Sequence, residues 1–197
     1  MAVRNGETHP HMTSLTVFSE HNPHQAERAI RERGGIAREL DRIGVLYEQW
    51  EASQPLDPDA SQDEIIEVYR EPIDRLMKQY GFRSVDVISL TSEHPQKEAL
   101  RDKFLHEHTH DDFEVRFFVE GEGVFYLHAE GRVFVVHCTR GDLLSVPAGM
   151  THWFDMGPEP NLTAIRLFTT PEGWVANFTG SAIADRFPRM DGIELAA

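Results

Sequence analysis

The densest group of chemically reactive side chains lies in a histidine-rich stretch past the middle of the chain. Six of the 11 histidines fall between residues 106 and 152, and the stretch begins His106-Glu-His-Thr-His-Asp-Asp-Phe-Glu-Val-Arg. Side chains alternate between the two faces of an extended strand, so five residues at even positions that could bind a metal or a substrate are predicted to share one face. These are His106, His108, His110, Glu114 and Arg116. Two histidines and a carboxylate on one face match the facial triad of non-haem iron sites.

A single histidine on a strand is more often a surface or hydrogen-bonded core residue than a metal ligand. Several polar groups gathered on one face are different, because burying them together is costly unless something binds them. We therefore expect a metal site that contains two of these histidines and Glu114. His152, from another predicted strand, is a candidate fourth ligand. The spacing alone leaves open whether His106 or His110 is the histidine that does not bind.

The composition excludes several classes of partner. The 197 residues suit one domain, and 19 Lys and Arg against 33 Asp and Glu give a net charge of −14. This charge repels nucleic acid and anionic membrane surfaces. The one cysteine excludes an intramolecular disulfide framework and a cysteine-based zinc cluster. No apolar run approaches the roughly 20 residues of a membrane span, and no signal peptide is evident. We expect a cytoplasmic monomer.

The N-terminal half predicts a mixture of strands and helices. Weak alternation predicts a strand over residues 13–19, and apolar spacing predicts a helix over residues 25–43. Gly34-Gly35 should bend or break that helix, because each glycine costs about 1 kcal/mol in a helix interior. A further strand is predicted over residues 45–50.

A second helical region begins at the capping box Ser61-Gln-Asp-Glu64 and ends at Gly81. Its apolar stripe indicates core packing, and Pro72 should kink the helix or split it in two. A strand over residues 84–90 and a short helix over residues 95–103 are predicted to follow.

From residue 104 to residue 168 short β-branched and aromatic runs alternate with turns that contain glycine. Strands are predicted over residues 115–119, 124–128, 133–138, 143–146 and 163–168. Strands this short and closely spaced indicate an antiparallel sandwich or barrel. Gly121-Glu-Gly123 and Glu130-Gly131 are the predicted hairpin turns.

Two motifs in this segment resemble those of the cupin superfamily. His108-x-His110-x-x-x-Glu114 followed by a glycine is similar to the first motif, and residues 141–152 are similar to the second. Cupins are small antiparallel β-barrels that hold one metal ion inside. The resemblance implies His108, His110, Glu114 and His152 as the ligands and leaves His106 outside the site.

The chain departs from the general cupin pattern at two positions. Asp102 stands where the pattern opens with glycine, and Met156 stands where it often has asparagine. Neither position is that of a ligand, so the implied metal site is unaffected.

Longer strings resemble the bacterial acireductone dioxygenases of methionine salvage, over residues 13–190. The strings include Asp86-Val-Ile-Ser-Leu, Pro95-Gln-Lys-Glu-Ala-Leu, Lys103-Phe-Leu, Glu114-Val-Arg-Phe-Phe-Val-Glu-Gly, Ser145-Val-Pro-Ala-Gly, His152-Trp-Phe-Asp-Met-Gly and Pro171-Glu-Gly-Trp-Val-Ala. The fold class implied is mainly β: a cupin barrel, which is a jelly-roll-like double-stranded β-helix, with N-terminal helices.

The chain is expected to have four parts. Residues 1–12 are expected to be a disordered leader, and residues 13–103 an α+β appendage packed on the barrel. Residues 104–170 are the expected cupin barrel core, and residues 171–197 a C-terminal segment that packs outside it.

The resemblance implies a metal-dependent oxidoreductase that cleaves acireductone, 1,2-dihydroxy-3-keto-5-methylthiopentene, with O2. With Fe(II) the family forms 4-methylthio-2-oxobutanoate and formate. With Ni(II) it forms 3-methylthiopropanoate, formate and carbon monoxide. One Fe(II) or Ni(II) per monomer is expected. The ligand types do not show which metal is bound, because the site would bind Ni(II) more tightly than Fe(II) but the supply of each metal in the cell decides which one occupies it.

Two kinds of substrate contact are predicted beside the metal. Arg116 would hydrogen-bond the substrate enediolate, although an ion pair with Glu114 or Glu107 is the alternative. The aromatic residues Phe104, Phe154 and Trp174 resemble those that line the family's substrate pocket, although each could be ordinary core.

Other interpretations remain open for the whole chain and for single residues. The rival functions are a cupin sugar-phosphate isomerase and a non-enzymatic cupin metabolite-binding module. An isomerase needs several basic groups for phosphate, and only Arg116 is predicted beside the ligands. Cys138 is expected to be a small buried hydrophobe, and His128 and His137 receive no role.

Overall fold

The computed structural model describes residues 12–52, 57, 60–170 and 175–192. Its strands are β1 (Ser14–Ser19), β2 (Asn22–Ile30), β3 (Leu46–Gln49), β4 (Ser84–Leu90), β5 (His108–Thr109), β6 (Glu114–Ala129), β7 (Arg132–Thr139), β8 (Asp142–Val146), β9 (Thr151–Asp155), β10 (Leu162–Phe168) and β11 (Asn177–Phe178). Its helices are α1 (Arg33–Asp41), α2 (Gln62–Val68), α3 (Arg70–Tyr80) and α4 (Lys97–Leu105), with short 3₁₀ turns η1 (Ile183–Arg186) and η2 (Met190–Gly192). The predicted mainly β fold with N-terminal helices is confirmed.

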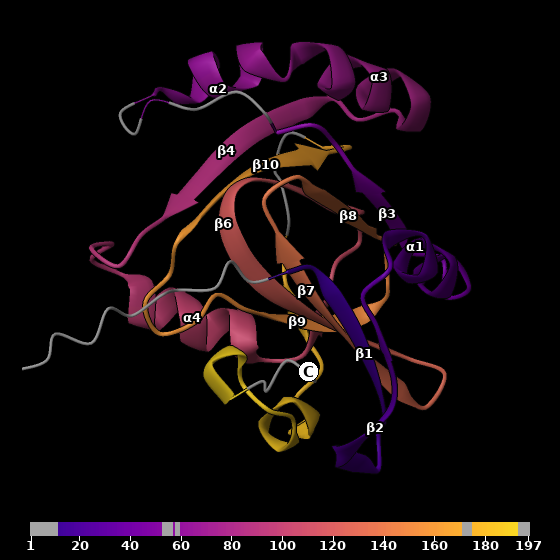
Figure 1. Ribbon diagram of the computed structural model, residues 1–197. Coiled ribbons are helices and arrows are strands. Elements are labelled where there is room, and N and C mark those ends of the chain that lie inside the picture. Colours follow the sequence, from indigo (N-terminus) through magenta and orange to yellow (C-terminus); the bar gives the residue numbers. More distant parts are fainter. Residues whose placement is uncertain (1–11, 53–56, 58–59, 171–174, 193–197) are drawn as a thin grey trace, which may run out of the picture.

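The long strand β6 joins the two halves of an antiparallel barrel (Figure 1). Its first part pairs with β8 and β10, and its second part pairs with β7 and β9. The sheet continues from β7 through β1 to β2, and from β9 through β5 to β11. Strands β5 and β6 both pair with β9, so the three strands meet at one place in the barrel. Four residues separate β5 from β6 in the chain.

The hairpin predicted at Gly121-Glu-Gly123 is wrong, because β6 runs through these residues. Here the strand passes from one set of partners to the other. Gly121 has φ +72°, and a Cβ there would overlap the backbone carbonyl of Asn161. The glycines thus allow the strand to bend against a neighbouring chain segment. The Glu130-Gly131 hairpin is confirmed, with positive φ at both residues and β6 paired with β7 on either side.

The helix predicted over residues 25–43 is wrong in its first part, because residues 22–30 form β2 and α1 begins only at Arg33. Strand β1 pairs with β7 on one edge and β2 on the other, and that pairing decides the conformation. Glu32 accepts hydrogen bonds from the amides of Gly34 and Gly35. The two glycines therefore lie in the first turn of the helix and do not interrupt it.

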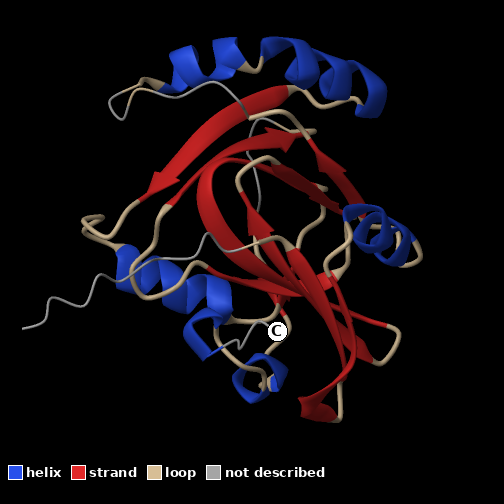
Figure 2. Cartoon of the chain, in the orientation of Figure 1, coloured by secondary structure: helices blue, strands red, loops and turns tan. Residues whose placement is uncertain are grey.

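Helices α2 and α3 pack across the outer face of β4 and β10 (Figures 1 and 2). The capping box at Ser61 and Glu64 is confirmed. The helical stretch is split at Tyr69, three residues before Pro72, and Gly81 ends α3 in the left-handed conformation. Ile73 and Leu76 of α3 are buried in one hydrophobic cluster with Val115 and Phe117 of β6.

A second core fills the inside of the barrel, with Leu15, Phe118, Phe125, Leu144 and Phe154 among its members. Because α1 and the strands of residues 13–103 share this core and these sheets, the molecule has one continuous body around the barrel. The expected boundaries at residues 103 and 170 stay predictions, and the predicted leader lies outside the described residues except for Met12. None of the helices in the described ranges is long and apolar enough to cross a membrane.

Candidate metal centre

Four buried side chains converge where β5, β6 and β9 meet. His108 of β5 lies directly opposite His152 of β9, His110 follows β5, and Glu114 is the first residue of β6. One potential ligand atom from each of the four residues lies within 4.8 Å of the others. The structure thus brings together the four predicted ligands.

We predicted from the sequence that His106 to Arg116 form one extended strand. The structure does not have such a strand. His106 is the exposed C-cap of α4, and its Nδ1 lies 2.7 Å from the carbonyl of Asp102. The chain turns between β5 and β6, and the amide of Gly149 holds this turn by donating to the carbonyl of His110. The prediction that His106 shares the ligand face is therefore wrong.

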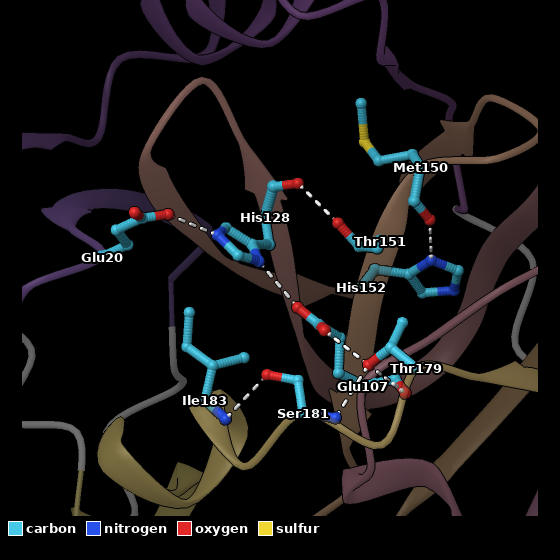
Figure 3. A network of polar contacts seen from close by, with 9 residues as sticks. All are labelled: Glu20, Glu107, His128, Met150, Thr151, His152, Thr179, Ser181 and Ile183. Atoms are coloured by element: carbon cyan, nitrogen blue, oxygen red, sulfur yellow. Dashed lines mark hydrogen bonds and ion pairs between the residues drawn. The ribbon is translucent and has the colours of Figure 1, made fainter.

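Backbone carbonyls fix the orientation of all three imidazoles. The Nδ1 atoms of His108, His110 and His152 lie 2.7, 2.8 and 2.8 Å from the carbonyls of His106, Val175 and Met150 (the last in Figure 3). A carbonyl only accepts, so each Nδ1 carries a proton and each Nε2 is the atom available as a ligand.

The Nε2 atoms face the carboxylate of Glu114. Those of His110 and His152 lie 3.0 and 2.8 Å from the same oxygen, Glu114 Oε2. An unprotonated Nε2 and a carboxylate are both acceptors, so a proton or a metal ion must lie between them. One divalent cation would satisfy these groups together, and imidazole with carboxylate suits iron and nickel. The residues present fit such an ion.

Burial and neighbouring charges shift the protonation equilibria of three of the ligands. Burial opposes ionisation of Glu114, but the nearby Arg116 guanidinium and hydrogen bonds from His110 and His152 hold its pKa well below the usual range. Burial, with the neighbouring His152, lowers the pKa of His108 to about 4, so this ring is neutral at pH 7. Burial also disfavours the charged form of His110, but the hydrogen bond to Glu114 outweighs it and raises the pKa.

Arg116 lies on the other side of Glu114, with Nε 3.0 Å from Oε1. Its guanidinium also stacks on aromatic rings, 4.2 Å from the ring centre of Phe154 and 5.7 Å from that of Phe104. The ion pair with Glu114 that the sequence analysis offered as an alternative is therefore present. The same side chain faces the cavity described next, so the ion pair and a substrate contact are compatible.

A cavity of about 240 Å³ opens beside the ligands. Arg116, Phe104 and Phe154 line it, as does Ile88 of β4. Trp174 lies outside the described residues.

Two basic residues at the cavity, Lys103 and Arg166, were not singled out from the sequence. Arg166 of β10 stands opposite Arg116 of β6 and makes a two-pronged ion pair with Asp86 at 2.8 and 2.6 Å. The pairing of β10 with β6 is remote in sequence, so nothing local indicated the position of Arg166. Lys103 lies in one of the strings that carry the family resemblance, and this is the signal that was available.

The other reactive residues lie away from the ligands. Cys138 is fully buried in the barrel core, where burial raises the pKa of the thiol well above its usual value. His137, also buried, contacts Glu122 at 2.8 Å. The expectation of a buried Cys138 is confirmed.

The whole sequence shows which family the chain belongs to. The model of the ARD/ARD' family matches residues 14–176. The chain belongs to the ARD/ARD' family. Among its relatives, the acireductone dioxygenases of Aquifex aeolicus and Methylococcus capsulatus are 54% and 57% identical to it. The alignments cover 92% and 91% of this chain and 98% and 96% of those proteins.

A solved structure of the same family supports the fold. Acireductone dioxygenase from Bacillus anthracis, described with a cadmium ion in its active centre, superimposes with a TM-score of 0.75 at 33% identity. The match covers 85% of this chain and 98% of that one. The cupin barrel expected from the sequence is thus confirmed for this ARD/ARD' family member.

Proposed function

We propose that this chain is an acireductone dioxygenase, an oxidoreductase that cleaves acireductone with O2 in methionine salvage. The observation that carries the proposal is the buried group of His108, His110, Glu114 and His152 beside a cavity, in a chain of the ARD/ARD' family. The expected partners are the small-molecule substrate and O2, and the expected oligomeric state is a monomer.

The four ligands would hold one Fe(II) or Ni(II) through three Nε2 atoms and a Glu114 oxygen. When bound, the ion supplies Lewis acidity and a template for two oxygens of the substrate. The protein's contribution is to fix the imidazoles through Nδ1 and to keep Glu114 ionised.

Arg116 would bind and orient the substrate. A buried guanidinium beside the ligands favours a deprotonated enediolate, because a charge-assisted hydrogen bond is stronger in a site shielded from water. Arg166 and Lys103 add positive charge at the same cavity. The substrate anion is therefore stabilised locally, although the chain as a whole carries a charge of −14.

An apolar wall would receive the methylthio end of the substrate. Phe104 and Phe154 pack edge to face with ring centres 6.3 Å apart, and Ile88 and Leu100 continue the wall. Burying a methylthio group on such a surface contributes on the order of 1–2 kcal/mol. Trp174 keeps its proposed place in this pocket from the family resemblance alone.

The choice of metal is proposed to direct the products. Fe(II) protein should form 4-methylthio-2-oxobutanoate and formate, and Ni(II) protein should form 3-methylthiopropanoate, formate and carbon monoxide. The test is to strip the protein with a chelator, reload it separately with each metal and identify the products from acireductone. Carbon monoxide from the Ni(II) form alone supports the proposal. Identical products from both forms would refute metal-directed regiochemistry, and no conversion by either form would refute the dioxygenase.

The three candidate functions differ in whether the protein consumes O2. A sugar-phosphate isomerase would use several basic groups to bind the phosphate. The sequence placed only Arg116 beside the ligands, whereas the structure adds Lys103 and Arg166 at the cavity. Family membership favours the dioxygenase. Isomerisation of a sugar phosphate without O2 uptake, or binding of a metabolite without turnover, would favour one of the rivals.

A further inference from the structure

A charged cluster surrounds His128, near the end of β6, and includes Glu107, the residue before the ligand His108 (Figure 3). His128 Nδ1 lies 2.7 Å from Glu107 Oε1, and Nε2 lies 2.8 Å from Glu20 Oε2. Ionised carboxylates only accept hydrogen bonds, so both ring nitrogens donate and the ring is an imidazolium. Burial opposes this charge, but the two carboxylates outweigh it and raise the pKa of His128.

Glu107 extends the cluster to the C-terminal part of the chain. Its second carboxylate oxygen accepts a 2.7 Å hydrogen bond from the Thr179 hydroxyl, and its backbone carbonyl accepts from the Thr179 amide at 3.1 Å. The Thr179 hydroxyl in turn accepts from the amide of Ser181. The side chain of Glu107 is buried, so these contacts are largely shielded from water.

The two segments that the cluster ties together carry the carbonyls that orient two ligands. Glu107 stands between His106, whose carbonyl accepts from His108 Nδ1, and His108 itself. Thr179 directly follows β11, which pairs with β5. Val175, two residues before β11, supplies the carbonyl that accepts from His110 Nδ1.

A third link runs to the remaining histidine. The Thr151 hydroxyl donates to the carbonyl of His128 at 2.9 Å, and Thr151 precedes His152 in β9. The cluster thus contacts the immediate chain neighbours of two ligands and the segment that orients the third.

We propose that Glu107, His128 and Thr179 form a latch that positions the metal ligands by fixing the backbone segments around His108 and His110. This inference rests on the proposed metal centre but not on the substrate. None of the three latch residues is itself among the four ligands, so the latch acts through them. Loss of such supporting contacts typically weakens metal binding about 10- to 100-fold.

The test compares two latch variants with a matched control. Thr179→Val removes one hydroxyl at nearly constant shape, and His128→Gln removes the imidazolium. The control is His137→Gln. His137 of β7, like His128, holds a carboxylate, Glu122 of β6, at 2.8 Å. It stands opposite Ser14 and Val124, which are not metal ligands. All three variants should lose thermal stability.

The deciding measurement is the dissociation constant for Co(II) or Ni(II), from competition with a chromophoric chelator, together with the Co(II) absorption spectrum. Both latch variants should bind about 10-fold more weakly or worse, with an altered Co(II) spectrum, while His137→Gln should match the wild type. Wild-type affinity and spectrum in Thr179→Val would overturn the latch, and this variant decides alone if His128→Gln does not fold. Because no substrate is used, failure of the latch and failure of the dioxygenase proposal give different results.

Discussion

At the scale of single residues, the contact between Glu114 and Arg116 sets the electrostatics of the centre. Glu114 is buried, and its two oxygens face different groups: Oε2 faces two imidazoles and Oε1 faces the guanidinium. Arg116 thereby offsets the charge of a ligand while it also lines the cavity. One side chain thus contacts a ligand and, as proposed, would also bind the substrate.

Replacing Arg116 separates these two roles. Arg116→Ala should retain one metal per chain, because a bound cation itself compensates Glu114, but kcat/KM for acireductone should fall by about 10²-fold or more. The measurements are metal content of the purified variant and steady-state kinetics of the metal-loaded protein. Full turnover in a folded, metal-loaded Arg116→Ala protein would show that the substrate role is wrong.

Gly123 controls the position of an aromatic ring in the same cavity. A Cβ at this position would overlap the ring of Phe154, which packs on the Arg116 guanidinium. Gly123→Ala should therefore destabilise the protein by about 1–3 kcal/mol through overpacking and raise KM for acireductone. Urea unfolding and steady-state kinetics measure the two effects.

The cause can be isolated with a second substitution. Phe154→Leu leaves more room, so in the Gly123→Ala background it should cost less stability than it does alone. Strictly additive free energies of unfolding would mean that the two positions do not clash.

At the scale of elements, α4 and β9 are locked together next to the cavity. Arg101 of α4 makes a two-pronged ion pair with Asp155 of β9, at 2.8 and 3.0 Å. Asp155 also accepts from the amides of Gly157 and Met190. This contact holds the helix that supplies Phe104 and Lys103 against the strand that supplies His152.

The lock should give a distinct pH dependence of stability. Burial opposes ionisation of Asp155, but Arg101 and the two amides outweigh it and lower the pKa in the folded state. A depressed pKa contributes stability above the unfolded value of about 3.9 and loses it as the pH falls below. Asp155→Asn should cost about 2 kcal/mol at pH 7, and the difference from the wild type should shrink below about pH 4.

Urea unfolding of both proteins between pH 3 and pH 7 measures this, and the comparison cancels the other titrating groups that the two proteins share. A difference that does not change across this range would show that the charge of Asp155 contributes nothing.

Elements set by local chemistry were predictable from the sequence, and elements set by distant partners were not. The capping box at Ser61, the stop at Gly81 and the Glu130-Gly131 hairpin each depend on a few neighbouring residues. By contrast, β2 is a strand because β1 lies beside it, and β6 passes through Gly121 because its partners change there.

The same distinction applies to the candidate site. The ligands were found from their spacing and the cupin resemblance, which a single sequence can show. Arg166 was missed, because it reaches the cavity only through the pairing of β10 with β6. The contacts of the latch were missed for the same reason, since Glu107, His128 and Thr179 come from three separate parts of the chain.

At the scale of the whole molecule, the barrel brings three basic side chains to one cavity of an acidic chain, and carboxylates pair with two of them. Arg116, Arg166 and Lys103 gather at one cavity in a chain with 33 acidic residues. The metal ion would add to this local field. Metal occupancy should therefore control binding and turnover of an anionic substrate.

The most direct test of the four-residue centre is O2 uptake with acireductone while metal-free protein is titrated with Fe(II). If this centre is the site of the reaction, the rate rises linearly with added metal and levels off at one equivalent per chain. Glu114→Ala should show no such rise, because the carboxylate ligand is missing. No O2 uptake above the metal-only background, or a rate that continues to rise well beyond one equivalent, would contradict the assignment of the four-residue centre as the site of the reaction.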